Sequence, residues 1–181
     1  MKISWIILSR IAALSESAYP RECCGAVVEN IAVSEGGAVM ESSVAVPEGH
    51  RRTLEVIPFT NIQDRMHEED PIRYPQTSGT AYFADPIELI ALFRSNRTIV
   101  LFYHSHIESP PYFSELDRRF ALYDGEPAYP GVAYLIVSMR HKKACEYAVY
   151  EFAPAERAYR CTDHGTIIPP DESPPSTGES S

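Results

Sequence analysis

The chain has 181 residues, of which 44% are hydrophobic and 23% charged, and this composition is typical of one globular domain. Its formal net charge of -9 argues against a surface that binds nucleic acid or an anionic membrane, because such partners favour basic faces. No stretch of the sequence approaches the roughly 18 unbroken apolar residues that a membrane helix needs. We therefore expect neither nucleic acid nor a membrane among its partners.

The first residues predict an amphipathic helix over 5–17, because apolar side chains recur there at helical intervals. The alternative is a cleaved signal peptide, and Ser9 and Arg10 argue against it since they interrupt the apolar run. The sequence also contains four cysteines: Cys23, Cys24, Cys145 and Cys161. None of them has C-x-x-C spacing, so we expect reduced thiols, burial of the adjacent pair, and a cytoplasmic protein.

The remaining elements alternate between strands and helices. Strand-like composition bordered by glycine or proline predicts strands over 24–30, 36–46, 53–57, 98–103, 131–139 and 144–152. Helices are predicted over 85–96 and 114–123. Residues 58–80 are polar and irregular, and so long a segment without periodicity is often a functional loop or flap. The predicted fold class is α/β, with a single mixed sheet flanked by helices.

Local signals set the expected boundaries. Asp85 is a candidate N-cap, Pro86 suits the first helical position, and Glu88 would complete a capping box. Residues 169–181 are rich in proline, serine and acidic side chains, so we expect a disordered tail there. The chain is accordingly divided into one domain over 1–168 and a tail over 169–181.

The strongest chemical signal is the sequence HSHIESPPYFSELD, residues 104–117. Residues i and i+2 of a strand project to the same side, so His104 and His106 emerge together if the strand continues through them. Two imidazoles can hold zinc, and a catalytic site adds a third protein ligand while one position stays open for water. Asp117, on the first turn of the next helix, can supply that third ligand.

A plainer interpretation uses the same residues without a metal. Ser114 and Asp117 fit the S-x-x-D capping box of a helix start, and an isolated H-x-H is more often a hydrogen-bonded surface pair. Glu108 and His67 are alternative ligands; the Pro-Pro pair after Glu108 limits how it folds back, and an exposed loop position is expected for His67. From the residues alone, both interpretations stay open.

A metal site that hydrolyses a bond also needs a group that moves protons. The H-E-x-x-H helix that combines ligands and base is absent from the sequence, so a glutamate from elsewhere must approach. The candidate is Glu22, in YPRECCG, between the end of the first helix and a strand bounded by glycine. The default interpretation of Glu22 is a solvated side chain beside Arg21.

The segment HSHIESPPYFSELD matches H-x-H-x(7)-S-x-x-D in full and resembles the signature of the JAMM (MPN+) metalloproteases. YPRECCG is similar to the family's P-x-E-x-C-G segment, and the resemblance covers about residues 3–152. It implies a cytidine-deaminase-like fold and one catalytic zinc per chain, held by His104, His106 and Asp117. It also implies that Glu22 activates the water and protonates the leaving amine, while Ser114 hydrogen-bonds the oxyanion.

The implied reaction is hydrolysis of a peptide or isopeptide bond after the C-terminal glycine of a ubiquitin-like protein. The compact chain resembles bacterial members, whose substrates are small sulfur-carrier or ubiquitin-like proteins; conjugation or activating enzymes are further expected partners. Residues 58–80 are expected to border the substrate groove. The sequence leaves open the bond, the pathway and the oligomeric state.

Other functions are weighed against this one. An amidohydrolase barrel needs a longer chain, metallo-β-lactamase-like enzymes need further ligands close behind the H-x-H pair, and a cysteine hydrolase built on Cys23 or Cys24 with His104 has no supporting spacing. The main alternative is a metal-free MPN-type binding scaffold, in which Ser114 and Asp117 only cap a helix.

Overall fold

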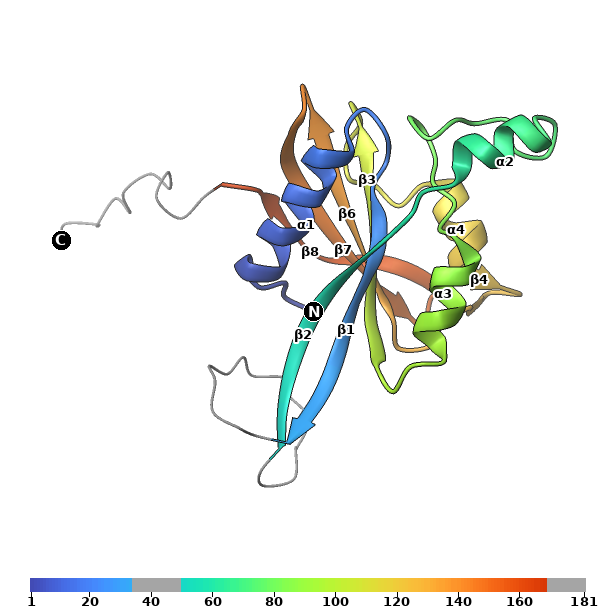
Figure 1. Ribbon diagram of the computed structural model, residues 1–181. Coiled ribbons are helices and arrows are strands. Elements are labelled where there is room, and N and C mark those ends of the chain that lie inside the picture. Colours follow the sequence, from blue (N-terminus) through green and yellow to red (C-terminus); the bar gives the residue numbers. More distant parts are fainter. Residues whose placement is uncertain (34–49, 169–181) are drawn as a thin grey trace, which may run out of the picture.

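The computed structural model describes residues 1–33 and 50–168, whose arrangement is shown in Figure 1. The helices are α1 (Trp5–Ala18), α2 (Gln63–Glu69), α3 (Pro86–Phe93) and α4 (Glu115–Ala121). The strands are β1 (Cys24–Val33), β2 (His50–Phe59), β3 (Thr98–Ile107), β4 (Leu122–Tyr123), β5 (Glu126–Pro127), β6 (Ala133–Arg140), β7 (Lys143–Ala153) and β8 (Ala158–Thr166). The strand predicted over 36–46 and the tail predicted over 169–181 lie outside the described residues.

Six of the strands form one mixed sheet in the order β2-β1-β3-β6-β7-β8. Neighbours are antiparallel except β3 and β6, which run parallel. A parallel pair requires a long crossover connection, and the crossover between β3 and β6 contains α4 and the small β4–β5 hairpin. The predicted fold class, a mixed sheet flanked by helices, is confirmed.

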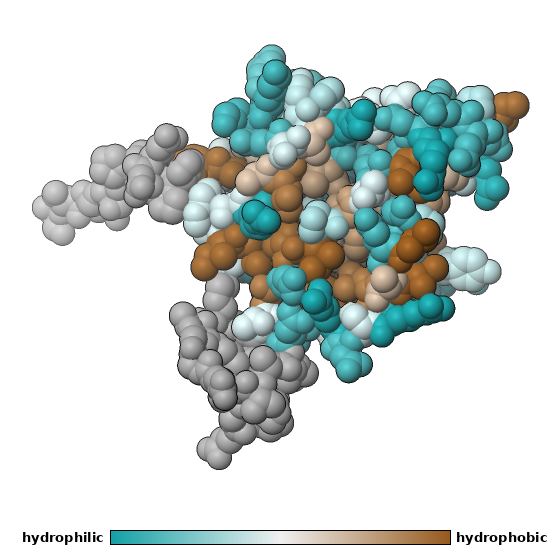
Figure 2. Space-filling model, viewed as in Figure 1, coloured by the Kyte–Doolittle hydropathy of each residue, from teal (hydrophilic) through white to brown (hydrophobic). Residues whose placement is uncertain are grey.

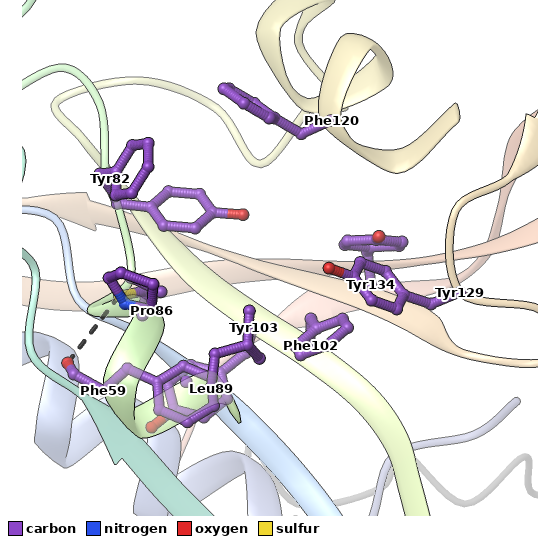
Figure 3. A pocket seen from close by; sticks show the side chains of 13 residues that line it. Phe59, Tyr82, Pro86, Leu89, Phe102, Tyr103, Phe120, Tyr129 and Tyr134 are labelled. Atoms are coloured by element: carbon purple, nitrogen blue, oxygen red, sulfur yellow. Dashed lines mark hydrogen bonds between the residues drawn. The ribbon is translucent and has the colours of Figure 1, made fainter. Parts of the chain in front are cut away.

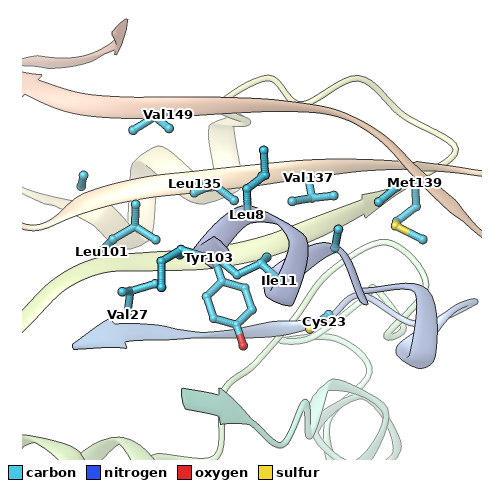
Figure 4. Packing of buried hydrophobic residues seen from close by; sticks show 14 residues of the cluster. Leu8, Ile11, Cys23, Val27, Leu101, Tyr103, Leu135, Val137, Met139 and Val149 are labelled. Carbon is cyan, nitrogen blue, oxygen red and sulfur yellow. The ribbon is translucent and has the colours of Figure 1, made fainter. Parts of the chain in front are cut away.

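Helix α1 covers one face of the sheet, as Figure 1 shows, and Figure 4 shows the packing beneath it. Leu8 and Ile11 of α1 belong to one buried cluster with Leu101 and Tyr103 of β3 and with Leu135 of β6. The helix predicted over 5–17 is confirmed. Its apolar stripe stabilises it, because a helix of this length depends on tertiary packing more than on propensity.

The opposite face lies under α3 and α4, and its packing divides into two clusters. One joins buried residues of β1, such as Ala26 and Val28, to Leu92 of α3. The other joins Ala121 of α4 to aromatic side chains, among them Tyr134 of β6. These two clusters meet at Phe102 of β3, a strand that is buried on both faces, as predicted for its central position.

Four elements differ from the sequence prediction. Strands β4 and β5 were not predicted, and β4 takes up Leu122–Tyr123, the last two residues of the helix predicted over 114–123, because α4 ends at Ala121. Helix α2 lies within residues 58–80, which were predicted to be irregular, and its sequence QDRMHEE has no apolar stripe to indicate it. Strand β8 was not predicted either. It pairs only with β7 among the described strands, and most of its side chains are exposed or half-buried, so it lacks the apolar content of the inner strands.

Of the capping box predicted for α3, the N-cap residue is confirmed and its second residue is not. Asp85 accepts a hydrogen bond from the Ile87 amide, as expected of an N-cap. Glu88 does not complete the capping box, because the Asp85 amide already donates to the Thr60 carbonyl. The Glu88 carboxylate accepts instead from the amide and the hydroxyl of Thr60. It therefore joins α3 to the end of β2 rather than capping its own helix.

Figure 2 shows hydrophilic side chains over α2 and hydrophobic ones at the surface around α3. The outward face of α3 includes Ile87, which is 76% exposed, and Ile90. Within the part of the chain that the structure describes, no helix is long and apolar enough to span a membrane.

Candidate active site

His104 and His106 lie at the carboxyl end of β3 and point to the same side, with their Nε2 atoms 3.2 Å apart. From the start of α4, Asp117 places its Oδ1 3.2 Å from His104 Nε2 and its Oδ2 3.7 Å from His106 Nε2. Ligand atoms of the three residues all lie within 4.8 Å of one another. The return loop thus brings the three predicted metal ligands into one cluster.

These separations suit a small tetrahedral ion. Ligand atoms at 2.0–2.1 Å from a tetrahedral zinc are about 3.3 Å from one another, and two imidazoles with one carboxylate form a donor set that catalytic zinc sites use. His106 Nδ1 faces the Pro110 carbonyl at 3.0 Å, the kind of outer bond that orients a ligand ring. His104 Nδ1 is buried without such a partner among the described residues. The donor set and the distances fit zinc.

The cluster is largely removed from solvent: His104 is 1% exposed and Asp117 is 7% exposed. Burial raises the pKa of Asp117, but attraction to His104 and hydrogen bonds with both imidazoles and Ser114 outweigh it, so the pKa is lowered. Burial lowers the pKa of His106, whereas Asp117 and Glu22 raise it, and the net direction is upward. An ionised carboxylate therefore stands beside the two imidazoles.

The capping box is also present, and Asp117 takes part in both arrangements. Its Oδ2 accepts from the amide of Ser114 at 2.8 Å and from the Ser114 hydroxyl at 2.6 Å, while the Asp117 amide donates to Ser114 Oγ. Its Oδ1 is the atom nearest His104. The cap and the metal site are therefore compatible. Because the Ser114 hydroxyl donates to Asp117, its role toward an oxyanion stays a prediction.

The pairing of β1 with β3 carries Glu22 to the histidines. Cys24 is the register partner of His104. Just beyond, the amide of Ser105 donates to the Cys23 carbonyl at 2.9 Å, and the Cys23 amide donates to Ser105 Oγ at 2.8 Å. The residue between the two histidines thus holds the backbone that follows Glu22.

Glu22 is 6% exposed and lines a cavity of about 370 Å³ together with His106, Ser114 and Asp117. Burial raises the pKa of its carboxyl to about 8; His106 opposes this shift and Asp117 adds to it. Arg21 does not pair with Glu22, because its guanidinium lies 3.7 Å from the carboxylate of Asp64. The default interpretation of Glu22 as a solvated side chain is therefore wrong.

Asn61 contributes to the site although the sequence did not single it out. Its Nδ2 donates to the Glu22 carbonyl at 2.9 Å and to the Ala81 carbonyl at 3.4 Å. Its Oδ1 accepts from the Phe83 amide at 3.1 Å and from the Gln63 amide at 3.0 Å. One amide group thereby joins the backbone of the candidate base to the segment after α2.

That segment forms one wall of the cavity, through Gln76, Gly79 and Thr80. The Ser78 carbonyl accepts from the Glu22 amide at 2.6 Å, which ties the wall to the base. Just after it, the ring of Tyr82 stacks on His104 with centroids 4.7 Å apart. Residues 58–80 therefore border the cavity, and its use as a substrate groove stays a prediction.

The alternative candidates lie elsewhere. Glu108 accepts from the Tyr19 hydroxyl and the His141 amide, and His67 Nδ1 faces the Tyr74 carbonyl at 2.7 Å; neither belongs to the cluster. All four cysteines are free, as predicted, and Cys23 and Cys24 are both buried. Burial raises the pKa of Cys23 to about 11 and raises that of Cys24 as well, which opposes a nucleophilic thiolate in the metal-free protein.

A family model described as prokaryotic homologs of the JAB domain matches residues 6–157. The chain belongs to this family. The match confirms the resemblance drawn from the two sequence motifs. The JAB family includes metalloisopeptidases, and the buried His104–His106–Asp117 group of this JAB domain is able to bind a metal ion.

One solved structure agrees with the fold, and a second is reported beside it. A solution structure of a protein from Salinibacter ruber is 24% identical, with a TM-score of 0.50, and the match covers 96% of this chain and 95% of that one. A solution structure of a protein from Desulfitobacterium hafniense is 17% identical over 86% of this chain and 85% of that one, with a TM-score of 0.49. No curated protein sequence matches this JAB chain.

Proposed function

We propose that the chain is a zinc-dependent peptidase or isopeptidase that cleaves the bond after the C-terminal glycine of a ubiquitin-like or sulfur-carrier protein. One observation carries the proposal: the buried His104–His106–Asp117 cluster borders, through His106 and Asp117, the cavity that the buried Glu22 lines. Two histidines, a carboxylate and a separate protonatable carboxyl are the groups that hydrolysis at a metal requires.

His104, His106 and Asp117 would hold the zinc ion, which supplies the Lewis acidity that makes water nucleophilic near neutral pH. Glu22 accepts the proton of the attacking water and returns it to the leaving amine. Its position suits this role, because a buried carboxyl on the cavity wall beside His106 and Asp117 lies within reach of the atoms that exchange the proton. The Ser114 hydroxyl turns from Asp117 to donate to the oxygen of the scissile carbonyl.

Asn61 and Ser105 support Glu22 rather than touching the substrate. The Asn61 side-chain amide donates to the Glu22 carbonyl, and Ser105 Oγ accepts from the amide of Cys23, the next residue. Positions fixed in this way keep a proton-transfer group within reach of the reacting atoms, and small displacements of such groups lower rates strongly. The choice of a ubiquitin-like substrate rests on the likeness to JAMM enzymes and on the JAB family match.

The test uses the full chain. Zinc is measured by plasma mass spectrometry, and hydrolysis is measured on ubiquitin-like proteins that carry either a C-terminal peptide extension or a lysine isopeptide. We expect one equivalent of zinc and cleavage after the terminal glycine of at least one substrate. EDTA should abolish cleavage and added zinc should restore it. His106→Ala should lose the metal, whereas the control His164→Ala, at an exposed position on β8, should keep it.

The metal-free scaffold is the alternative, and the complete capping box favours it, since that box uses Ser114 and Asp117 without any metal. Such a protein would contain far less than one equivalent of zinc, and none could be restored. That result would exclude the proposed hydrolysis. A zinc-loaded chain that cleaves no ubiquitin-like substrate would exclude only the substrate class.

A further inference from the structure

A second cavity, of about 280 Å³, lies on the α3–α4 side of the sheet. Figure 3 shows the side chains around it, with Phe120 on α4 across from Pro86 and Leu89 on α3. Phe102 of β3 and Tyr134 of β6 are also part of its wall. None of the residues that line it is charged, although charged residues make up 23% of the chain. The cavity is therefore an apolar space in an otherwise strongly charged protein.

The aromatic wall is preformed because its rings pack on one another. Tyr129 lies edge-on to Phe102 with ring centroids 5.0 Å apart, and it stacks on Phe93 at 5.5 Å. Phe102 in turn contacts Tyr134 at 5.9 Å. Protein interiors contain few voids larger than a water molecule, and ligand pockets are mostly apolar, largely preformed and fitted with few polar groups. The wall has the properties of a pocket rather than of a packing defect.

The aromatic cavity adjoins the candidate active site. Tyr82 and Phe120 line both the aromatic cavity and the cavity that holds Glu22. The Tyr82 ring also stacks on His104, and Phe120 is 58% exposed. A group that enters the aromatic cavity therefore lies beside the residues that would hold the metal. A polypeptide at the reaction centre can reach the cavity with a side chain close to the cleaved bond.

Size and chemistry identify the occupant. A cavity of about 150 Å³ already admits benzene, so the larger space here accommodates an aromatic side chain. A charged side chain would lose its hydration without finding a partner. The rest of this chain cannot supply an aromatic occupant, because residues 34–49 and 169–181 contain no Phe, Tyr or Trp.

We propose that the aromatic cavity is a specificity pocket that receives one large apolar side chain, preferentially aromatic, from the polypeptide substrate. The identity of the substrate in this inference rests on the proposed function. The binding of an aromatic group in the cavity does not depend on it. The pocket selects among substrates by a side chain next to the cleaved bond, so it adds a requirement beyond the terminal glycine.

The first experiment measures binding without turnover. N-acetyl-phenylalanine amide and N-acetyl-alanine amide are titrated into the full chain and followed by NMR, in zinc-loaded and in EDTA-treated protein. We expect the phenylalanine probe to bind at least 10-fold more tightly than the alanine probe. Leu89→Trp, which fills the pocket, should remove that preference. Ile87→Trp places the same side chain on the exposed face of α3 and should preserve it.

The second experiment measures turnover on paired substrates that differ only in phenylalanine or alanine beside the cleaved bond. The wild type and Ile87→Trp should prefer phenylalanine by about 10-fold or more in kcat/KM, the range that one apolar group confers. Leu89→Trp should bring the ratio close to one. Should Leu89→Trp fail to fold, Phe120→Ala at the exposed rim should lower the ratio instead.

The outcomes separate the two proposals. Equal binding of both probes, or a phenylalanine preference that persists in Leu89→Trp, overturns the pocket even if the protein hydrolyses its substrate. Probe binding with no effect on the kcat/KM ratio means that a free aromatic molecule is the occupant, and this too overturns the proposal. If the zinc-loaded protein cleaves none of the substrates, the proposed substrate class fails and probe binding alone decides the pocket.

Discussion

Strand β3 sends alternate side chains to two faces of the sheet that differ in packing and in chemistry. On the α1 face, Leu101 and Tyr103 belong to one continuous buried cluster. On the α3–α4 face, Phe102 borders an aromatic cavity, and His104 and His106 belong to the polar cluster. The comparison teaches that one strand can stabilise the fold through one face while the other face keeps space and buried polar groups for a ligand.

The largest effect is expected on the α3–α4 face, from Glu22→Gln. The amide cannot transfer a proton, so kcat should fall by roughly 10²- to 10⁴-fold, the contribution of a general acid–base. Zinc content and the melting temperature should stay at or above the wild-type values, because an ionisable buried group is removed. Turnover assays, metal analysis and thermal unfolding check this; unchanged turnover would show that Glu22 is not the base.

Ser114→Ala separates the two uses of the α4 cap. As an oxyanion donor, Ser114 should contribute roughly 10²- to 10³-fold to kcat, and as an N-cap about 0.5–2 kcal/mol to stability. Ser4 caps α1 on the other face, where its side chain accepts from the Ile7 amide. Ser4→Ala should therefore lose stability alone. If the two variants have equal kcat at matched concentrations of folded protein, Ser114 acts only as the N-cap of α4.

The packing difference predicts unequal costs for similar truncations. Ile11→Ala removes a fully buried side chain from the α1 face and should lower the free energy of unfolding by about 2–5 kcal/mol. Leu89→Ala, at the wall of the aromatic cavity, should cost less than half as much, because Leu89 already borders empty space. Denaturant titrations of both variants measure this. A larger loss for Leu89→Ala would contradict the contrast between the faces.

The smallest effect is expected from Asn61→Asp. Aspartate keeps the two acceptor bonds to the amides of Gln63 and Phe83 but cannot donate to the Glu22 carbonyl. Hydrogen bonds of this kind contribute about 0.5–1.5 kcal/mol, so kcat should fall by about 3- to 10-fold with KM little changed. Asn30→Asp, where the exposed amide donates to Glu55, is the control and should retain full kcat.

Part of the site could be predicted because its geometry is local. The period of a strand places His104 and His106 on one side, and a short loop with a capping box returns Asp117. Glu22 was identified through its motif, but its burial depends on the pairing of β1 with β3. That pairing joins residues more than 70 positions apart in the sequence, such as Cys24 and His104. Periodicity carries no information about such a pairing.

Other features were missed for related reasons. Asn61 bonds backbone groups of Glu22 and of the segment after α2, and a backbone partner leaves no mark in the sequence. Helix α2 has no apolar face, and its capping signal is weak, since Ile62 at the N-cap has no side-chain hydrogen bond. The hydrogen-bond partner of Glu88 could not be assigned from the sequence, because Thr60 takes the Glu88 carboxylate that would otherwise cap α3. Each of these depends on tertiary contacts.

The double use of Asp117, in the helix cap and in the metal cluster, has an evolutionary consequence. A related chain without the metal site would still need Ser114 and Asp117 to begin α4, so selection for folding would retain both. His104 has no such second use: one ring nitrogen is buried without a partner among the described residues and the other faces the cluster. Among related chains, we therefore expect the loss of His104 to mark a chain without the metal site more sensitively than the loss of S-x-x-D.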